Sequence, residues 1–188
     1  MKTLIWKGIF YQSLEYFNLH SDDKGYTVES KIIGCHEDKI YVLNYKILSD
    51  KDWNVQDFLI ESEINTVKRT FSGKRNQNHW KINGVVHSEF NNFKFIDISL
   101  TPFTNTLPIN NLKLAENSSQ EIKVIYIDVL NKVIKPVTQQ YTRISADQYR
   151  YDNLQTDFTA DISVDESGLI VNYPELFEKI AELKTNNQ

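Results

Sequence analysis

The feature that most constrains the fold is an alternation of apolar and polar residues with a period of two. In residues 41–47, Tyr, Leu, Tyr and Ile occupy every second position, and Asn44 and Lys46 lie between them. Successive side chains of a strand point to opposite faces of its sheet, so this pattern is typical of a half-buried strand. Comparable patterns predict strands at residues 3–20 with a break near Gly8, 25–34, 38–48, 55–61, 65–71, 79–87, 94–100, 111–115, 121–130, 134–144, 158–164 and 168–172.

These predicted strands cover more than half of the chain, which indicates a large antiparallel sheet. Polar links that contain Asn, Asp or Gly favour hairpins in which consecutive strands pair. Such links lie at residues 21–25, 72–74, 82–84 and 165–168. No linker or composition shift divides the 188 residues. We therefore expect a single domain over residues 1–188, with residues 184–188 as a frayed tail.

One helix is predicted, and it begins near Pro174. Proline suits the first turn of a helix, and Glu175 lies near the positive end of the helix dipole. The apolar residues at helical spacing are Leu176, Phe177, Ile180, Ala181 and Leu183. This stripe predicts packing on the sheet. The expected fold is therefore mainly β, a long antiparallel sheet with one packed α-helix.

Charge and apolar content exclude several classes of partner. The chain carries 21 Lys and Arg against 25 Asp and Glu, a net charge of -4, with both signs interspersed. Nucleic acid and anionic membranes require a cationic surface, so neither is an expected partner. Apolar runs extend over only a few residues, which argues against membrane insertion. Residues 1–8 lack the pattern of a signal peptide, and the single cysteine, Cys35, allows no intrachain disulfide, so we expect a cytoplasmic protein.

Motifs for catalysis, metals and cofactors are missing from the sequence. The four histidines lie far apart and lack the spacing of metal ligands. There is no glycine-rich phosphate loop, nucleophile elbow or dinucleotide fingerprint. We therefore predict no metal, no cofactor, no catalytic residue and no enzymatic activity.

Residues 96–109 form the most unusual segment of the sequence. Alternation places Asp97, Ser99 and Thr101 on one face of a strand, just before a loop that Pro102 and Pro108 stiffen. The hydroxyl and amide groups of this loop suit a sugar or another polar head group. A proline-braced corner that satisfies its own backbone is the alternative.

Other candidates lie in aromatic surroundings. Glu15 lies within an apolar, aromatic stretch that runs from Phe10 to Phe17, and it is either a buried acid lining a site or a residue at a sheet edge or on the outer face. We assign Trp6, Trp53 and Trp80 to the core rather than to ligand stacking, since buried aromatic residues are common.

At residues 96–109 the chain resembles a bacterial family of glycolipid-binding proteins. The matching features are Trp6, Glu15, Trp53, Trp80, residues 101–108, 140–142, 149–151 and 165–174. The resemblance implies a sheet rolled around a helix, as a spiral β-roll or half-barrel similar to bacterial lipoprotein-localisation carriers, with a cavity and a homodimer. The family tends to carry basic residues where this chain has Asn54-Val55-Gln56 and Asn110-Asn111. A preference for anionic head groups is therefore not carried over.

The leading hypothesis is a protein that binds a glycolipid or another amphiphile without covalent chemistry. An apolar tail would occupy a cavity lined by the sheet, and a polar head would lie at its mouth. The candidate binding residues are Glu15, Asp97, Thr101, Asn105, Thr106, Tyr141 and Tyr173. One alternative is a homodimeric interaction protein without a small ligand. Another is a small hydrolase-like enzyme that uses Glu15 and Asp97 as an acid and base pair.

Overall fold

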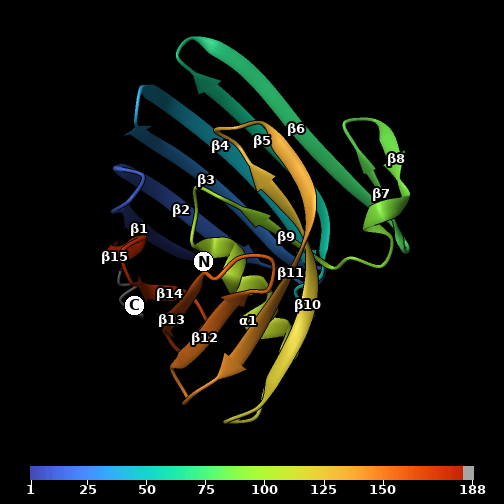
Figure 1. Cartoon of the computed structure of the whole chain (residues 1–188), viewed down its shortest axis with the longest axis vertical. Coiled ribbons are helices and arrows are strands. Elements are labelled where there is room, and N and C mark those ends of the chain that lie inside the picture. Colours follow the sequence, from blue (N-terminus) through green and yellow to red (C-terminus); the bar gives the residue numbers. More distant parts are fainter. Residues whose placement is uncertain (184–188) are drawn as a thin grey trace.

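A computed structural model describes residues 1–183, and within them fifteen strands form one sheet (Figure 1). The predicted frayed tail, residues 184–188, lies outside the described residues. The strands are β1 (Lys2–Gly8), β2 (Ser13–Ser21), β3 (Gly25–His36), β4 (Lys39–Asp50), β5 (Val55–Ile64), β6 (Val67–Asn76), β7 (His79–Ile82), β8 (Val85–His87), β9 (Phe95–Ile98), β10 (Ser119–Asp128), β11 (Val133–Arg143), β12 (Gln148–Asn153), β13 (Thr159–Val164), β14 (Ile170–Tyr173) and β15 (Phe177–Glu182). The helical segments are η1 (Ser88–Phe90), η2 (Phe103–Asn105) and α1 (Thr106–Leu112).

The sheet is built almost entirely from strands that pair with their neighbours in the sequence. Its order is β8-β7-β6-β5-β4-β3-β2-β1-β15-β14-β13-β12-β11-β10-β9, so β1 and β15 meet in its middle. All pairs are antiparallel except β9 with β10, which is parallel. The sheet stays open, with β8 and β9 at its edges. The expected mainly β fold, a long sheet rolled around a helix, is confirmed.

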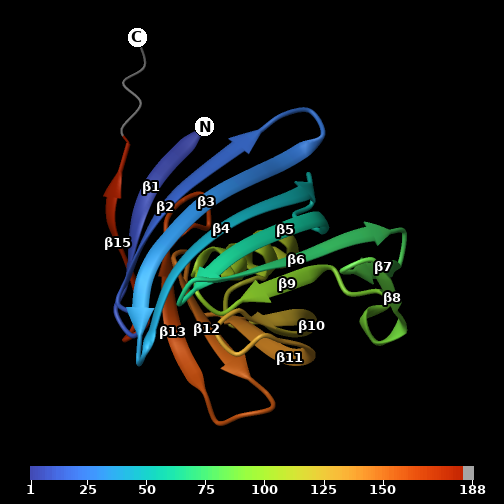
Figure 2. The ribbon, with the colours of Figure 1, turned by 90° about the horizontal axis from the view of Figure 1, so that it is seen from above.

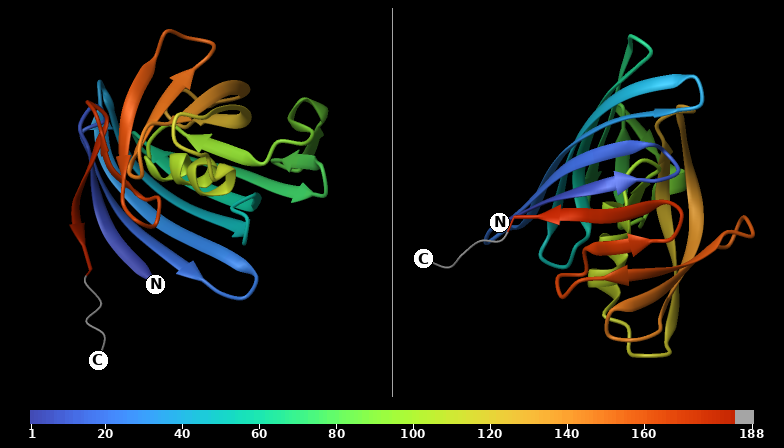
Figure 3. Two further views of the ribbon diagram at one scale, coloured as in Figure 1. Left: turned by 90° about the horizontal axis from the view of Figure 1, so that it is seen from below. Right: turned by 90° about the vertical axis from the view of Figure 1, so that its left-hand side faces the viewer.

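The parallel pair explains why a helix lies inside the roll. Parallel neighbours need a crossover connection, and the segment that joins β9 to β10 contains η2 and α1. Figure 2 shows α1 between the arch of β1 to β5 and the strands β9 to β13. Residues 106–109 are all buried, which fits a helix enclosed by the sheet. From a third direction, β7 and β8 extend away from this body (Figure 3).

The helix lies in a different segment from the predicted one. Residues 106–112 form α1, although the sequence favoured a braced loop and a strand at 111–115. The predicted helix from Pro174 is wrong, because residues 177–182 form β15 and pair with β1 and β14. Glu175 has a left-handed backbone, with φ of 64°, which a helix cannot include.

Turn positions are partly as predicted. Asn83 and Gly84 both have positive φ, and they join β7 to β8 in a tight hairpin. The predicted turn at 72–74 is wrong, because these residues lie inside β6. A Cβ atom at Gly73 would clash with the ring of Phe58, so the glycine here allows close packing rather than a turn. Strand β12 was not predicted.

The tryptophans lie in the core, as the sequence predicts. The side chains of Trp6 and Trp80 are fully buried, and Trp53 is 8% exposed. The indole N–H of Trp6 donates to the Ile170 carbonyl at 2.7 Å. The indole of Trp80 donates in the same way to Phe93, at 2.9 Å. Within residues 1–183, no helix is long and apolar enough to cross a membrane.

Candidate functional site

A cleft of about 680 Å³ lies beside the helical segment that fills the roll. Its walls come from the turn between β1 and β2, from β9 to β12, and from the segment that joins β14 to β15. The lining residues are Phe10, Tyr11, Asp97, Ile98, Ser99, Thr101, Asn105, Tyr126, Lys135, Val137, Tyr151, Asn153, Gln155, Thr156, Phe158, Tyr173, Glu175, Leu176 and Phe177. This volume is typical of pockets for small ligands.

Four of the seven predicted site residues line this cleft, namely Asp97, Thr101, Asn105 and Tyr173. Thr101 and Asn105 lie deep in it, with 3% and 7% of their surfaces exposed. Phe10 and Phe158 lie at its rim, where they are 54% and 43% exposed. The segment from β9 to η2 therefore supplies polar groups to the inner end of the cleft.

Asp97 is the half-buried acid of the cleft wall. Its Oδ1 accepts a hydrogen bond from the Thr104 hydroxyl at 3.1 Å, and its Oδ2 accepts one from the Gln139 amide at 2.7 Å. Burial raises the pKa of Asp97, and these two hydrogen bonds oppose that increase. Each carboxylate oxygen keeps a lone pair that a ligand could use.

Four tyrosines line the same cleft as this carboxyl group, namely Tyr11, Tyr126, Tyr151 and Tyr173. Burial raises the pKa values of Tyr126 and Tyr151, and the nearby charge of Asp97 raises them further. The pKa of Tyr11 is raised to about 12, first by burial. Among the described residues, the hydroxyls of Tyr11, Tyr126 and Tyr173 form no hydrogen bond with protein groups. The cleft thus presents free phenol hydroxyls and aromatic faces.

The aromatic rings form one continuous group along the cleft. The ring centroids of Tyr151 and Tyr173 lie 6.2 Å apart, and those of Tyr173 and Phe177 lie 6.3 Å apart. Tyr11 continues the series, 6.0 Å from Phe177, and Phe158 lies 6.3 Å from Tyr173. These spacings allow the rings to pack against each other and against a flat or apolar ligand.

Glu15 lies behind the cleft rather than in its lining. Its Oε1 accepts hydrogen bonds from the hydroxyls of Tyr45 at 2.6 Å, Ser30 at 2.7 Å and Thr101 at 3.0 Å. Its Oε2 is buried and has no partner among the described residues. Burial raises the pKa of Glu15 to about 7, against the three hydrogen bonds, which lower it. No hydrogen bond joins Glu15 to Asp97 within residues 1–183, so the proposed acid and base pair lacks a direct link.

Tyr141 and Thr106 also lie outside the lining. The Tyr141 hydroxyl donates to Oδ1 of Asn105 at 2.7 Å, so it fixes the orientation of a cleft residue. Thr106 is fully buried, and its hydroxyl has no partner within the described chain.

Sequence reasoning missed Tyr11, Tyr126, Tyr151 and Lys135 as lining residues. Strand alternation places Tyr151 on an apolar face, but strand β12 was not predicted, so its register was unknown. Lys135 and Tyr126 face each other across β10 and β11, and the Lys135 ammonium lies 5.8 Å from the Tyr126 ring centroid.

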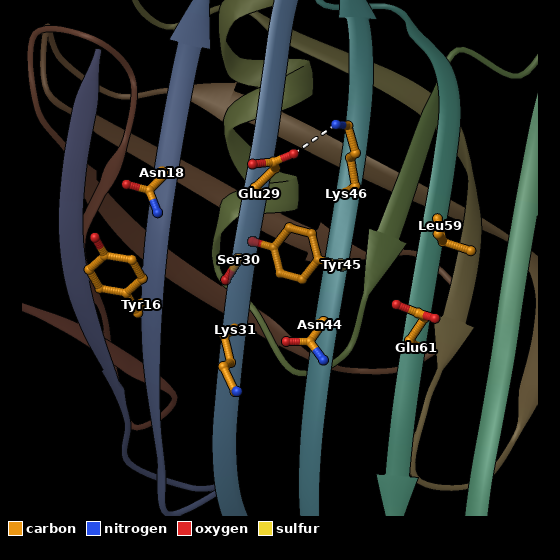
Figure 4. A pocket seen from close by; sticks show the side chains of 10 residues that line it. All are labelled: Tyr16, Asn18, Glu29, Ser30, Lys31, Asn44, Tyr45, Lys46, Leu59 and Glu61. Atoms are coloured by element: carbon orange, nitrogen blue, oxygen red, sulfur yellow. Dashed lines mark hydrogen bonds and ion pairs between the residues drawn. The ribbon is translucent and has the colours of Figure 1, made fainter.

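A second hollow, of about 380 Å³, lies on the outer face of β2 to β5 (Figure 4). Tyr16, Lys31 and Glu61 belong to positions that alternate with core residues, and α1 is seen behind the strands. The ammonium of Lys46 pairs with Glu29 at 2.7 Å across this hollow. It lacks the group of buried aromatic rings that lines the cleft, so the cleft is the stronger candidate.

At two places, near Asn54 and near Asn111, the chain carries no basic residue although the family that it resembles tends to have one, and these two places lie together. The Asn111 amide donates to Oδ1 of Asn54 at 3.3 Å. Neither residue lines the cleft. Both places therefore lie outside the lining of the cleft.

Comparisons with known proteins agree with this architecture. A family model described as "Putative glycolipid-binding" matches residues 3–179. A crystal structure of a DUF1089 family protein from Pseudomonas aeruginosa is similar, with a TM-score of 0.80 and 32% sequence identity, over 88% of this chain and 92% of that chain. No curated protein matches the chain. Because this family model spans residues 3–179, almost the whole rolled sheet, the chain belongs to the family with that description.

Proposed function

We propose that the protein binds an amphiphile in the cleft beside α1, without covalent chemistry. The observation that carries this proposal is the lining, which combines buried aromatic rings with a carboxyl group and unengaged phenol hydroxyls in about 680 Å³. Ligand pockets commonly pair a mostly apolar wall with a few polar groups that fix orientation. Membership of the glycolipid-binding family supports an amphipathic ligand.

The depth of each residue suggests how the ligand would lie. The deepest polar residues, Thr101 and Asn105, are nearly inaccessible, whereas Phe10 and Phe158 are exposed at the rim. We infer that the polar head enters first and that the tail contacts the rim. This orientation is the reverse of the sequence-based expectation, in which the head lies at the mouth.

The seven predicted site residues then have two kinds of role. Asp97, Asn105 and Tyr173 would contact the head group from the cleft wall. Thr101, whose hydroxyl is already engaged with Glu15, would act with it to fix the inner end of the cleft. Tyr141 would hold Asn105 in place, and Thr106 would act through packing alone.

Native mass spectrometry of protein purified without detergent tests the proposal. Solvent extraction would identify any amphiphile that travels with the protein, and dodecyl maltoside below its micelle concentration would serve as a defined probe. We expect a one-to-one complex that Tyr173→Phe weakens by about tenfold, because one hydrogen bond to the ligand is lost.

Tyr149→Phe is the matched control, since Tyr149 is equally buried but lies outside the cleft lining. An apo mass that stays unchanged after natural lipids and the probe are added would overturn the proposal. Binding that both variants weaken equally would also count against the cleft as the site.

A further inference from the structure

Asp97 has no positively charged partner within residues 1–183. Its two hydrogen bonds come from Thr104 and Gln139, which are both neutral. No lysine, arginine or histidine nitrogen among the described residues lies within 4.0 Å of its oxygens, the distance that defines the ion pairs of this chain. Removing a carboxylate from water is costly unless an opposite charge compensates it. The cleft therefore holds a carboxyl group whose negative charge, when it is ionised, no cationic group of the described chain pairs with.

Aromatic side chains line the cleft together with this carboxyl group. The tyrosines among them are Tyr11, Tyr126, Tyr151 and Tyr173. The register of β9 and β10 pairs Tyr126 directly with Asp97. The face of an aromatic ring attracts cations through its quadrupole. A carboxylate among several such rings is the arrangement that recognises ammonium groups.

One ring of the cleft wall, that of Tyr126, lies near a cation of the chain, the ammonium group of Lys135. Lys135 is exposed, and its ammonium lies 5.8 Å from the centre of the Tyr126 ring. The pairing of β9, β10 and β11 places Asp97, Tyr126 and Lys135 in one row across the sheet. Lys135 therefore lies one strand beyond Tyr126, on the side away from Asp97, and it forms no ion pair with Asp97 within the described residues.

We propose that the head group of the ligand carries a positively charged nitrogen, which Asp97 and the surrounding tyrosine rings bind. This inference rests on the proposed function of the cleft and specifies its ligand class. An amino group on a sugar and a quaternary ammonium head share this chemistry. A phosphate head would instead meet the charge of Asp97 and be repelled.

Isothermal titration calorimetry with four amphiphiles of equal tail length tests the inference. The probes are dodecylammonium, dodecyltrimethylammonium, dodecyl maltoside and dodecyl phosphate, each below its micelle concentration. We expect the cationic probes to bind at least about tenfold more tightly than the maltoside, and the phosphate to bind most weakly. A preference for the primary amine would indicate hydrogen bonding to Asp97, and a preference for the quaternary group would indicate contact with the rings.

The variant Asp97→Asn removes the charge and keeps an oxygen that can accept from Thr104 or Gln139. We expect it to abolish the preference for cations, so that the two cationic probes bind no more tightly than the maltoside does to the same variant. Asp23→Asn, in an exposed turn, is the matched control and should behave as the wild type. If Asp97→Asn fails to fold, the comparison of the four probes on the wild-type protein still tests the inference.

The outcomes separate this inference from the proposed function. Equal binding of the cationic and neutral probes, or a cation preference that survives in Asp97→Asn, would overturn the inference and leave the proposed function intact. Failure of all four probes to bind would overturn both. Tight binding of dodecyl phosphate would overturn the inference that the cleft prefers a cationic head group, and it would leave the proposed function intact.

Discussion

The carboxyl group of Glu15 should make the stability of the protein fall as the pH rises from about 4.5 to 7. Burial raises the pKa of Glu15 from 4.5 to about 7 in the folded state. The folded state then binds this proton more tightly than the unfolded chain does. Its contribution to stability is complete below pH 4.5 and is lost as the pH rises through about 7.

The size of this effect follows from the two pKa values. At about 1.4 kcal/mol per pH unit, the difference between 4.5 and about 7 corresponds to a loss of about 3 kcal/mol in the free energy of unfolding. The variant Glu15→Gln cannot ionise, and its side-chain oxygen can still accept hydrogen bonds from Ser30, Tyr45 and Thr101. It resembles the protonated acid, so its stability should lack this component of the pH dependence.

Urea unfolding at a series of pH values, followed by tryptophan fluorescence, measures the effect. Trp6 and Trp80 are fully buried, so unfolding changes their surroundings strongly. The difference in unfolding free energy between the wild type and Glu15→Gln should decrease by about 3 kcal/mol between pH 4.5 and 8. A difference that stays constant, or that grows in favour of the wild type with rising pH, would refute the reasoning.

Glu29→Gln is the matched control. Glu29 lies on the outer face of β3, and its ion pair with Lys46 lowers its pKa. Its ionisation therefore occurs below the tested range. The difference between wild type and Glu29→Gln should stay flat from pH 5 to 8, which separates the effect of Glu15 from general effects of removing a charge.

Three further comparisons use urea unfolding at constant pH. Thr104→Val should lower the free energy of unfolding by about 1–3 kcal/mol, because the Thr104 hydroxyl donates to Asp97 and accepts from the Ile98 amide. Thr106→Val should leave it nearly unchanged, because the buried Thr106 hydroxyl has no partner among the described residues. Equal losses of stability in the two variants would contradict this assignment. Gly73→Ala should lower the free energy of unfolding by about 1–3 kcal/mol, because the added methyl group clashes with the Phe58 ring. Gly84→Ala should lower it by about 1 kcal/mol, because Gly84 has a positive φ, although the space around it is open. The opposite order would show that the ring of Phe58 can move aside. Trp6→Phe should lower the free energy of unfolding more than Trp53→Phe, because of these two tryptophans only Trp6 donates an indole hydrogen bond within the described residues; similar losses would show that ring volume alone matters.

The sequence predicts the strands well because each strand has one face in the core. In β4, Tyr41, Leu43, Tyr45 and Ile47 are all buried, as their alternation requires. Helix α1 gave no such signal, because it has only seven residues, of which 106–109 are all buried and 110–112 are partly buried. So short a helix, buried through its whole first turn, has no amphipathic period to detect.

Near its C-terminal end the sequence predicts a helix where the structure has β15, because a helical pattern is present there without a helix. Residues 176–183 carry apolar residues at helical spacing, yet Ile180 is 50% exposed in β15. The backbone of β15 completes the sheet between β1 and β14, and this pairing outweighs the local pattern. Sequence alone cannot reveal a pairing partner that lies almost the whole chain away.

The candidate site was only partly predictable. The prolines and polar side chains of the segment that carries Asp97, Thr101 and Asn105 indicate a binding loop, and these three residues line the cleft. Other parts of the lining come from Tyr11, Tyr126 and Tyr151, which lie on strands or turns distant in sequence. Their convergence depends on the curvature of the whole sheet, which no local pattern encodes.

The meeting of β1 and β15 in the middle of the sheet has a consequence for folding kinetics. Every other antiparallel pair joins consecutive strands, so two meanders can form locally, and only the register of Leu4 with Glu182 requires a closure across nearly the whole chain. A circular permutant that links the two ends and opens the chain between β8 and β9 would make this closure local. Stopped-flow refolding of the permutant should then be faster than that of the natural order, and an unchanged rate would place the slow step within one of the two meanders.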